Sequence, residues 1–356
     1  MKKRQANFEV LRVVAMAMIV AMHFMHNGSI LQPLTGNMTV VNSLAWLLES
    51  FCIVAANCYV LIAGYFLVEA EWKLKKLVML VAQVLFYSIF IPLICLITGT
   101  SDVGSWSVYE WLTAVLPLQS DHYWFATAYI LMFALCPVLA AGVKQLTKRQ
   151  LETVIAVLLI YFCLFKTICP LQLANDRFCY DYPWFICLFL IAAYIRLYYH
   201  KESGLQTFGF SLHLSGKKGM LGYVVLTVII FVFSICLGLL NRKIAILDHY
   251  MNMVYSYNHI LTLLSSLSLF FAFLHWEPKE NGFVRGICKI APYTFAVYLI
   301  HENIAVRHLW TGWLFANRVQ NSLLFIPCML IAIIVVFAVG VLVDIIRKKI
   351  FTILFK

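Results

Sequence analysis

Long apolar runs alternate with short polar segments along the whole chain. A window of about 19 residues identifies ten runs that are long and apolar enough to cross a bilayer as α-helices. The predicted spans are 8–27, 42–68, 75–98, 122–143, 150–168, 183–200, 219–240, 255–275, 287–306 and 322–346. The pattern therefore predicts an all-α membrane protein with about ten transmembrane helices.

Basic residues fall mainly on one side of this map. If the N-terminus is cytoplasmic, twenty of the 27 lysine and arginine residues lie in cytoplasmic segments or at their edges, and five lie in outer segments. Cytoplasmic loops of membrane proteins are enriched in lysine and arginine. The bias predicts that both termini are cytoplasmic, and it explains the net charge of +11 without nucleic acid as a partner.

The amino-acid composition also indicates that the chain lies in a membrane. The chain is 63% hydrophobic and 12% charged, whereas soluble domains carry about 25% charged residues. The surrounding solvent is therefore largely lipid. No stretch has the composition of a second soluble domain, so we expect residues 1–356 to form a single transmembrane domain without an appended soluble domain.

The first span carries two ionisable residues, Arg12 and His23, and such residues inside a membrane usually mark a site. Eleven residues correspond to roughly 1100° of helix, so both side chains share one face, about 16 Å apart along the axis. Taken singly, Arg12 can snorkel to the interface beside Glu9 and His23 can bond a neighbouring helix. Their shared face favours a functional role.

Polar residues in three other spans are further candidates. His301 and Glu302 reach the depth of His23, but helical neighbours point about 100° apart, so only one should aim at a central site. Asn57 can hydrogen-bond a bound group or another helix. His122, Tyr123 and Trp124 begin the fourth span, where a substrate contact competes with an aromatic interfacial belt.

The sequence lacks the motifs that several kinds of enzyme and metal site require. The eleven cysteines form no CxxC pair or metal-spaced cluster, so we expect no metal. Cys169 and Cys179 can pair only if their loop faces an oxidising compartment. The chain has no GxSxG elbow, P-loop, HExxH or GxGxxG motif before a helix. Serine hydrolysis, ATP-driven pumping and zinc proteolysis therefore lose support.

Four landmarks in order resemble the acyltransferase-3 family of integral membrane acyltransferases, which includes polysaccharide O-acetyltransferases of bacterial envelopes. The first is Arg12, ten residues and then His23. The family's F-x-x-x-S-G-[FY] pattern is similar to Tyr59–Tyr65, H-x-W-F to His122–Phe125, and Y-L-I-H to Tyr298–His301. Ala63 stands where the family has serine, so the role of that hydroxyl is not carried over.

The resemblance implies transfer of an acyl group, acetyl by preference, from cytoplasmic acyl-CoA to a hydroxyl of an envelope or exported polysaccharide, free or lipid-linked. Arg12 would pair with a phosphate of coenzyme A. His23 would act as general base or carry a transient acyl group. The residues expected to bind substrate are Asn57, His122, Tyr123, Trp124, His301 and Glu302. The expected location is the bacterial inner membrane, crossed many times.

Two other classes of function fit some of these observations. A secondary transporter of a small envelope-related solute also has about ten helices and buried charges, but the sequence shows no convincing repeat or paired broken helices. A non-catalytic protein of envelope assembly or sensing is the third interpretation. Neither explains why the four landmarks occur in this order.

Overall fold

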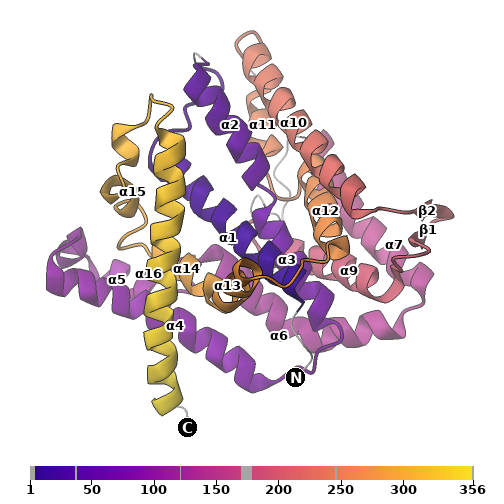
Figure 1. The fold of residues 1–356 in the computed structure, drawn as a ribbon, viewed down its shortest axis with the longest axis horizontal. Coiled ribbons are helices and arrows are strands. Elements are labelled where there is room, and N and C mark those ends of the chain that lie inside the picture. The colour runs from indigo at the N-terminus through magenta and orange to yellow at the C-terminus, as the bar shows by residue number, and fades with distance from the viewer. Residues whose placement is uncertain (1–4, 37, 121, 170–178, 245–246, 355–356) are drawn as a thin grey trace.

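The computed structural model describes residues 5–36, 38–120, 122–169, 179–244 and 247–354, and these residues are almost entirely helical (Figure 1). Within them, eight helical segments are long and apolar enough to cross a membrane. Two shorter apolar helices, Tyr182–Tyr198 and Ile260–His275, match the predicted spans 183–200 and 255–275. The prediction of an all-α membrane protein is confirmed.

The apolar helices follow the order of the predicted spans. They are α1 (Ala6–Asn27), α2 (Val40–Cys52), α3 (Ala55–Leu67), α4 (Leu74–Thr98), α6 (Trp124–Gln145), α7 (Lys148–Leu159) with η2 (Ile160–Leu164) and α8 (Phe165–Ile168), α9 (Tyr182–Tyr198), α10 (Gly216–Asn241), α12 (Ile260–His275), α13 (Gly282–Ile290) with η3 (Ala291–Tyr293) and α14 (Thr294–His301), and α16 (Phe325–Leu354).

Short elements connect these helices. They are η1 (Asp102–Ser105), α5 (Val108–Val115), the hairpin of β1 (Leu205–Thr207) and β2 (Phe210–Leu212), α11 (Leu247–Val254), α15 (Trp310–Trp313) and η4 (Ala316–Arg318). The two strands pair antiparallel with Gln206 opposite Ser211. This hairpin is the one β-sheet among the described residues.

Three predicted spans are interrupted. The second divides into α2 and α3 at Ile53 and Val54, and the fifth contains the π-helical turn η2. The ninth span contains the 3₁₀ turn η3, where Pro292 has no N–H to donate to an α-helical hydrogen bond. Its last helix, α14, ends at His301. Extension of that helix to residue 306 was therefore a wrong prediction, and the error matters because it falls at the candidate site.

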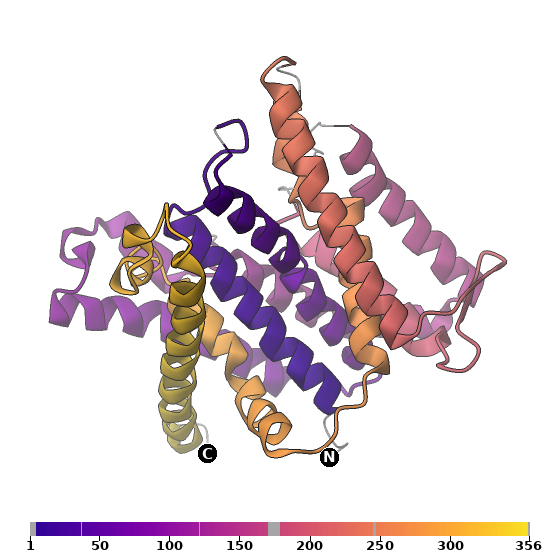
Figure 2. The ribbon, with the colours of Figure 1, turned by 45° about the horizontal axis from the view of Figure 1, so that its top comes forward.

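Helix α1 and the α2–α3 span form the inside of the bundle. In their most apolar windows, 67% and 78% of the residues are buried, against 28% in both α4 and α16. Figures 1 and 2 place the first turn of α1 and the last turn of α16 on the same side of the molecule. That placement agrees with an even number of crossings, and the cytoplasmic assignment of this side stays a prediction.

Helices α3 and α9 approach each other closely at Gly64. A Cβ atom on Gly64 would lie 2.8 Å from the Cα of Phe189 and 3.0 Å from the Cβ of Ala192. Real Cβ atoms essentially never come so near a backbone atom. The missing side chain of Gly64 therefore allows α3 and α9 to pack closely at this point.

We expect Gly64→Ala to destabilise the protein by about 1–3 kcal/mol, because the added methyl group must push α3 and α9 apart. Thermal unfolding of the purified protein in detergent measures the change. Gly142→Ala is the matched control, since nothing lies within 4 Å of a Cβ atom there. Equal midpoints for the two variants would contradict the close-packing argument.

Candidate active site

Helix α1 places Arg12 and His23 near its two ends, each beside its own cavity. Arg12 lines a cavity of about 300 Å³ together with Tyr59, Ala63 and Phe125. His23 lines a cavity of about 400 Å³ with Trp46, Glu49 and Trp124. Because α1 is continuous from Ala6 to Asn27, the two side chains are separated by about 16 Å along the axis, as predicted.

Two residues of the α14 terminus converge on His23. Its Nδ1 atom lies 2.9 Å from Nε2 of His301 and 3.1 Å from Oε1 of Glu302. His301 is the last residue of α14, and Glu302 follows it with a non-helical backbone (φ −95°, ψ 6°). The prediction that only one of these neighbours can reach a central site is wrong, because the helix ends between them.

The hydrogen-bond geometry sets the tautomers of both rings. Nδ1 of His301 lies 2.6 Å from the carbonyl oxygen of Val297, which only accepts, so Nδ1 carries the proton. In a neutral ring Nε2 of His301 is then an acceptor. The proton between the two rings therefore sits on Nδ1 of His23, where Glu302 also accepts it. Nε2 of His23 is left with its lone pair.

Arg12 is held by groups on its own helix and on α3. Its guanidinium forms a 2.8 Å ion pair with Glu9, the partner expected from the sequence. The hydroxyl of Tyr59 donates to the Arg12 carbonyl at 2.9 Å. About a quarter of the Arg12 side chain stays exposed (27%), so the cation faces its cavity while paired. Ala63 lines the same cavity and brings no hydroxyl to it.

Aromatic side chains dominate the cavity beside His23. Trp46 and Tyr255 have ring centroids 4.9 Å apart, and Trp124 stacks on Tyr257 at 5.5 Å. One polar pair faces the same space: Nε2 of His26 lies 3.1 Å from Glu49, whose side chain is 4% exposed. Aromatic faces beside a buried carboxylate are a chemically suitable surface for a polar ligand with apolar faces.

Of the remaining predicted residues, Asn57 makes bonds between helices. Its amide donates to the Tyr257 carbonyl at 2.8 Å and to Ser266 at 3.2 Å, and its oxygen accepts from Nε1 of Trp184 at 3.0 Å. The residue is 1% exposed. The sequence leaves open whether Asn57 binds a ligand or another helix, and in the structure it bonds to other helices.

His122 and Tyr123 hold the chain that follows α14. Nε2 of His122 accepts from the Ile304 N–H at 3.1 Å, and its Nδ1 lies 3.1 Å from the Ser88 hydroxyl. The Tyr123 hydroxyl donates to the Leu299 carbonyl at 2.8 Å and accepts from Asn303 at the same distance. Both residues are buried and support the segment carrying His301 and Glu302 from behind, whereas Trp124 reaches the cavity itself.

An aromatic partition separates the two cavities. We use this name for Phe125 and Tyr298, whose ring centroids are 5.7 Å apart. Phe125 also contacts Tyr59 of the Arg12 cavity and Trp124 of the His23 cavity, with centroids 6.0 and 5.6 Å away. No described residue lines both cavities. A group passing from Arg12 to His23 therefore has to displace these rings.

Some of these groups carry little signal in the sequence. Glu49 is one acidic residue within an apolar run, and the aromatic residues around it are typical of a membrane interface: Trp46, Tyr180, Tyr255 and Tyr257. The two tyrosines at the start of the predicted span 255–275 are the available clue. No disulfide joins Cys169 and Cys179, which are both among the described residues.

The cluster also has the composition of a metal site. The ligand atoms of His23, His301 and Glu302 lie within 4.8 Å of one another, and zinc accepts such a set. Their donor and acceptor roles, however, complement one another through the proton on Nδ1 of His23. The hydrogen-bonding atoms of these three side chains thus satisfy one another.

Comparison with known proteins agrees with the landmarks in the sequence. Neither the curated proteins nor the solved structures contain a match to this chain. The acyltransferase-3 family, described as an acyltransferase domain, matches residues 5–343. That range contains Arg12, His23, the aromatic partition and the His301–Glu302 turn. The chain therefore belongs to the acyltransferase-3 family of membrane acyltransferases.

Proposed function

We propose that this membrane acyltransferase moves an acyl group, by preference acetyl, from cytoplasmic acyl-CoA to a hydroxyl of an envelope or exported polysaccharide, in the inner membrane of a bacterium. The proposal rests on the hydrogen bonds that His23 makes and on the cavity that its ring borders. Its Nδ1–H is held by His301 and Glu302, and its ring borders a cavity suited to a sugar. That arrangement presents a lone pair at Nε2 to an incoming hydroxyl.

The reaction follows from this lone pair. The acceptor hydroxyl gives its proton to Nε2 of His23 while its oxygen attacks the thioester carbon. The carbon–sulfur bond breaks, and the leaving thiolate takes the proton from Nε2. Between the two transfers His23 is an imidazolium, and the adjacent Glu302 carboxylate stabilises that charge in a low-dielectric site.

A covalent route uses the same groups. Nε2 of His23 can attack the thioester carbon directly, so that the carbon–sulfur bond breaks, the thiolate leaves and takes a proton from solvent, and His23 holds the acyl group. The sugar hydroxyl then attacks the acyl carbon, the carbon–nitrogen bond breaks, and the hydroxyl proton passes through the freed imidazole to solvent. This route separates the two half-reactions in time, which suits two cavities divided by the aromatic partition. His23 is the reacting group in both routes, as base or as nucleophile, so both predict the same loss on substitution.

The donor side is assigned to Arg12. Guanidinium groups bind phosphate through paired, charge-assisted hydrogen bonds. The long arm of coenzyme A separates its phosphates from the thioester, so a phosphate near Arg12 and a reacting carbon near His23 fit one molecule. The aromatic cavity of Trp46, Glu49 and Trp124 is then left for the acceptor, since sugar rings pack their C–H faces on aromatic rings.

His23→Ala and His23→Gln should lower acyl transfer by about 100-fold or more, because neither side chain can accept and return the proton. Mass spectrometry of envelope glycans and lipids, in a deletion strain carrying each variant at wild-type protein level, measures the loss. His213→Ala, at an exposed histidine, is the matched control. Full acylation by His23→Ala would overturn the assignment, and altered solute uptake with intact acylation would favour a transporter.

His301 and Glu302 should behave as one unit. We expect His301→Gln and Glu302→Gln each to reduce kcat by about tenfold or more with a smaller change in KM, because both act through Nδ1 of His23. Membranes given radiolabelled acetyl-CoA and the native glycan provide the rates. The double variant should be little slower than the slower single variant. Multiplicative losses would show that the two residues act independently.

A further inference from the structure

A third cavity, of about 560 Å³, lies between the start of α4 and the end of α16 and is strongly basic. Four cationic side chains line it: Lys75, Lys76, Arg347 and Lys348. Its other lining residues are Met79, Leu80, Gln83, Phe351 and Thr352, so no carboxylate faces the space. We call it the basic vestibule. The positive-inside bias places it at the cytoplasmic side.

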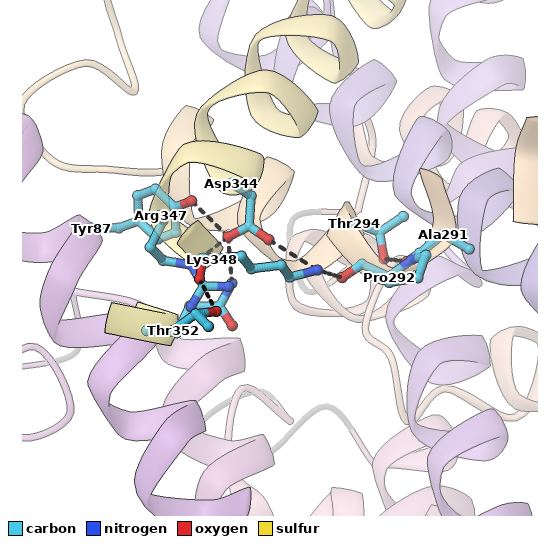
Figure 3. A network of polar contacts seen from close by, with 9 residues as sticks. Tyr87, Ala291, Pro292, Thr294, Asp344, Arg347, Lys348 and Thr352 are labelled. Carbon is cyan, nitrogen blue, oxygen red and sulfur yellow. Dashed lines mark hydrogen bonds and ion pairs between the residues drawn. The ribbon is translucent and has the colours of Figure 1, made fainter. Parts of the chain in front are cut away.

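A buried carboxylate behind the wall organises two of these cations, as Figure 3 shows. Asp344 is fully buried, and its Oδ1 atom accepts from Nε of Arg347 at 2.6 Å and from Tyr87 at 2.8 Å. Nζ of Lys348 lies 3.5 Å from its other oxygen and 3.6 Å from the centre of the Tyr293 ring. Among the described residues, one buried carboxylate behind the wall and four cations in the lining give this part of the molecule a net positive charge.

The other two cations lie across the cavity on the first turn of α4. Lys75 and Lys76 are exposed, and no carboxylate of the described chain forms an ion pair with either. Adjacent exposed lysines repel each other when no anion is near. Together with Arg347 and Lys348 they surround a space that is large enough for a charged ligand and open to solvent on one side.

The vestibule adjoins the Arg12 cavity. Leu80 and Gln83 line both spaces, so the two volumes meet at one turn of α4. Gln83 also donates to Asp344 at 3.2 Å, which ties this junction to the carboxylate that orients the cations. Leu80 and Gln83 are therefore the shared boundary of the two cavities, and a ligand that reaches from the vestibule to Arg12 passes these two side chains.

We propose that the basic vestibule is the binding site for the nucleotide end of the acyl donor, with the ribose 3′-phosphate of coenzyme A held by Lys75, Lys76, Arg347 and Lys348. This inference rests on the proposed function, because it takes acyl-CoA as the donor. Arg12 then meets the part of the molecule nearer the pantetheine arm. The arm runs past Leu80 and Gln83, with its thioester directed to the aromatic partition and His23.

The same phosphate chemistry is offered by an anionic lipid headgroup. Continuity with the Arg12 cavity favours the nucleotide, because a lipid would place its phosphate at the membrane surface and its chains in the bilayer. The test therefore uses soluble probes and lipids side by side. Equilibrium binding requires no acceptor, so its outcome does not depend on identifying the glycan.

The experiment compares CoA, 3′-dephospho-CoA and pantetheine as ligands of the purified protein by isothermal titration calorimetry. Wild type should bind CoA about tenfold more tightly than 3′-dephospho-CoA. Lys75→Gln/Lys76→Gln should weaken CoA binding about tenfold, abolish the preference for the 3′-phosphate, and leave pantetheine binding unchanged. Added salt should reduce the difference between wild type and variant.

Lys217→Gln/Lys218→Gln is the matched control. These two lysines are also adjacent, exposed and in the first turn of a helix, α10, but they lie outside the vestibule. The control should bind all three probes like wild type. Equal CoA affinity in the two double variants would overturn the vestibule assignment while leaving the proposed function intact.

Nanodiscs of phosphatidylcholine, with and without phosphatidylglycerol, separate the lipid alternative. CoA binding in pure phosphatidylcholine should still be weakened by Lys75→Gln/Lys76→Gln. If the substitution leaves CoA binding in pure phosphatidylcholine unchanged and lowers only the retention of phosphatidylglycerol in the mixed nanodiscs, the site is a lipid site and the inference fails. If wild type binds no CoA and transfers no acyl group from acyl-CoA, the proposed function itself fails, and the inference with it.

Discussion

A titratable or charged side chain inside a bilayer has to find its partner within the protein, because lipid offers none. Much of this architecture follows from that constraint. Arg12 pairs with Glu9, and His23 contacts the end of α14. Asp344 joins α4 to α16 through the Tyr87 hydroxyl. The Arg12–Glu9 pair lies within α1, whereas the contacts of His23 and Asp344 also fix how two helices meet, so these two polar groups help to hold the bundle together.

The same constraint explains which parts of the fold were readable from sequence. Hydropathy located the spans because the bilayer sets the length of a helix and the polarity of its surface. The Arg12–His23 spacing was readable too, since α1 is one uninterrupted helix. These features depend on local sequence and the membrane alone. The matching family landmarks depend on local sequence as well.

The convergence of His301 and Glu302 depends on contacts distant in sequence. Helix α14 ends where Asn303 bonds the Tyr123 hydroxyl and where His122 receives the Ile304 N–H. Those partners come from the start of α6, roughly 180 residues earlier. A prediction from hydrophobic periodicity alone therefore extended the helix beyond His301 and placed the side chains of His301 and Glu302 about 100° apart. The pairing of His26 with Glu49 was hidden for a similar reason, since it joins two different helices.

The aromatic partition has a consequence for the membrane as well as for the reaction. The two cavities lie near opposite ends of α1, and an open passage between them would contain imidazole and carboxylate groups suited to proton hopping. Such a passage would discharge an ion gradient across the bilayer. Phe125 and Tyr298 interrupt it with rings in contact. Rings in contact leave little room for the chain of water molecules that carries protons, so the contact that divides the two cavities also limits proton leakage through the protein.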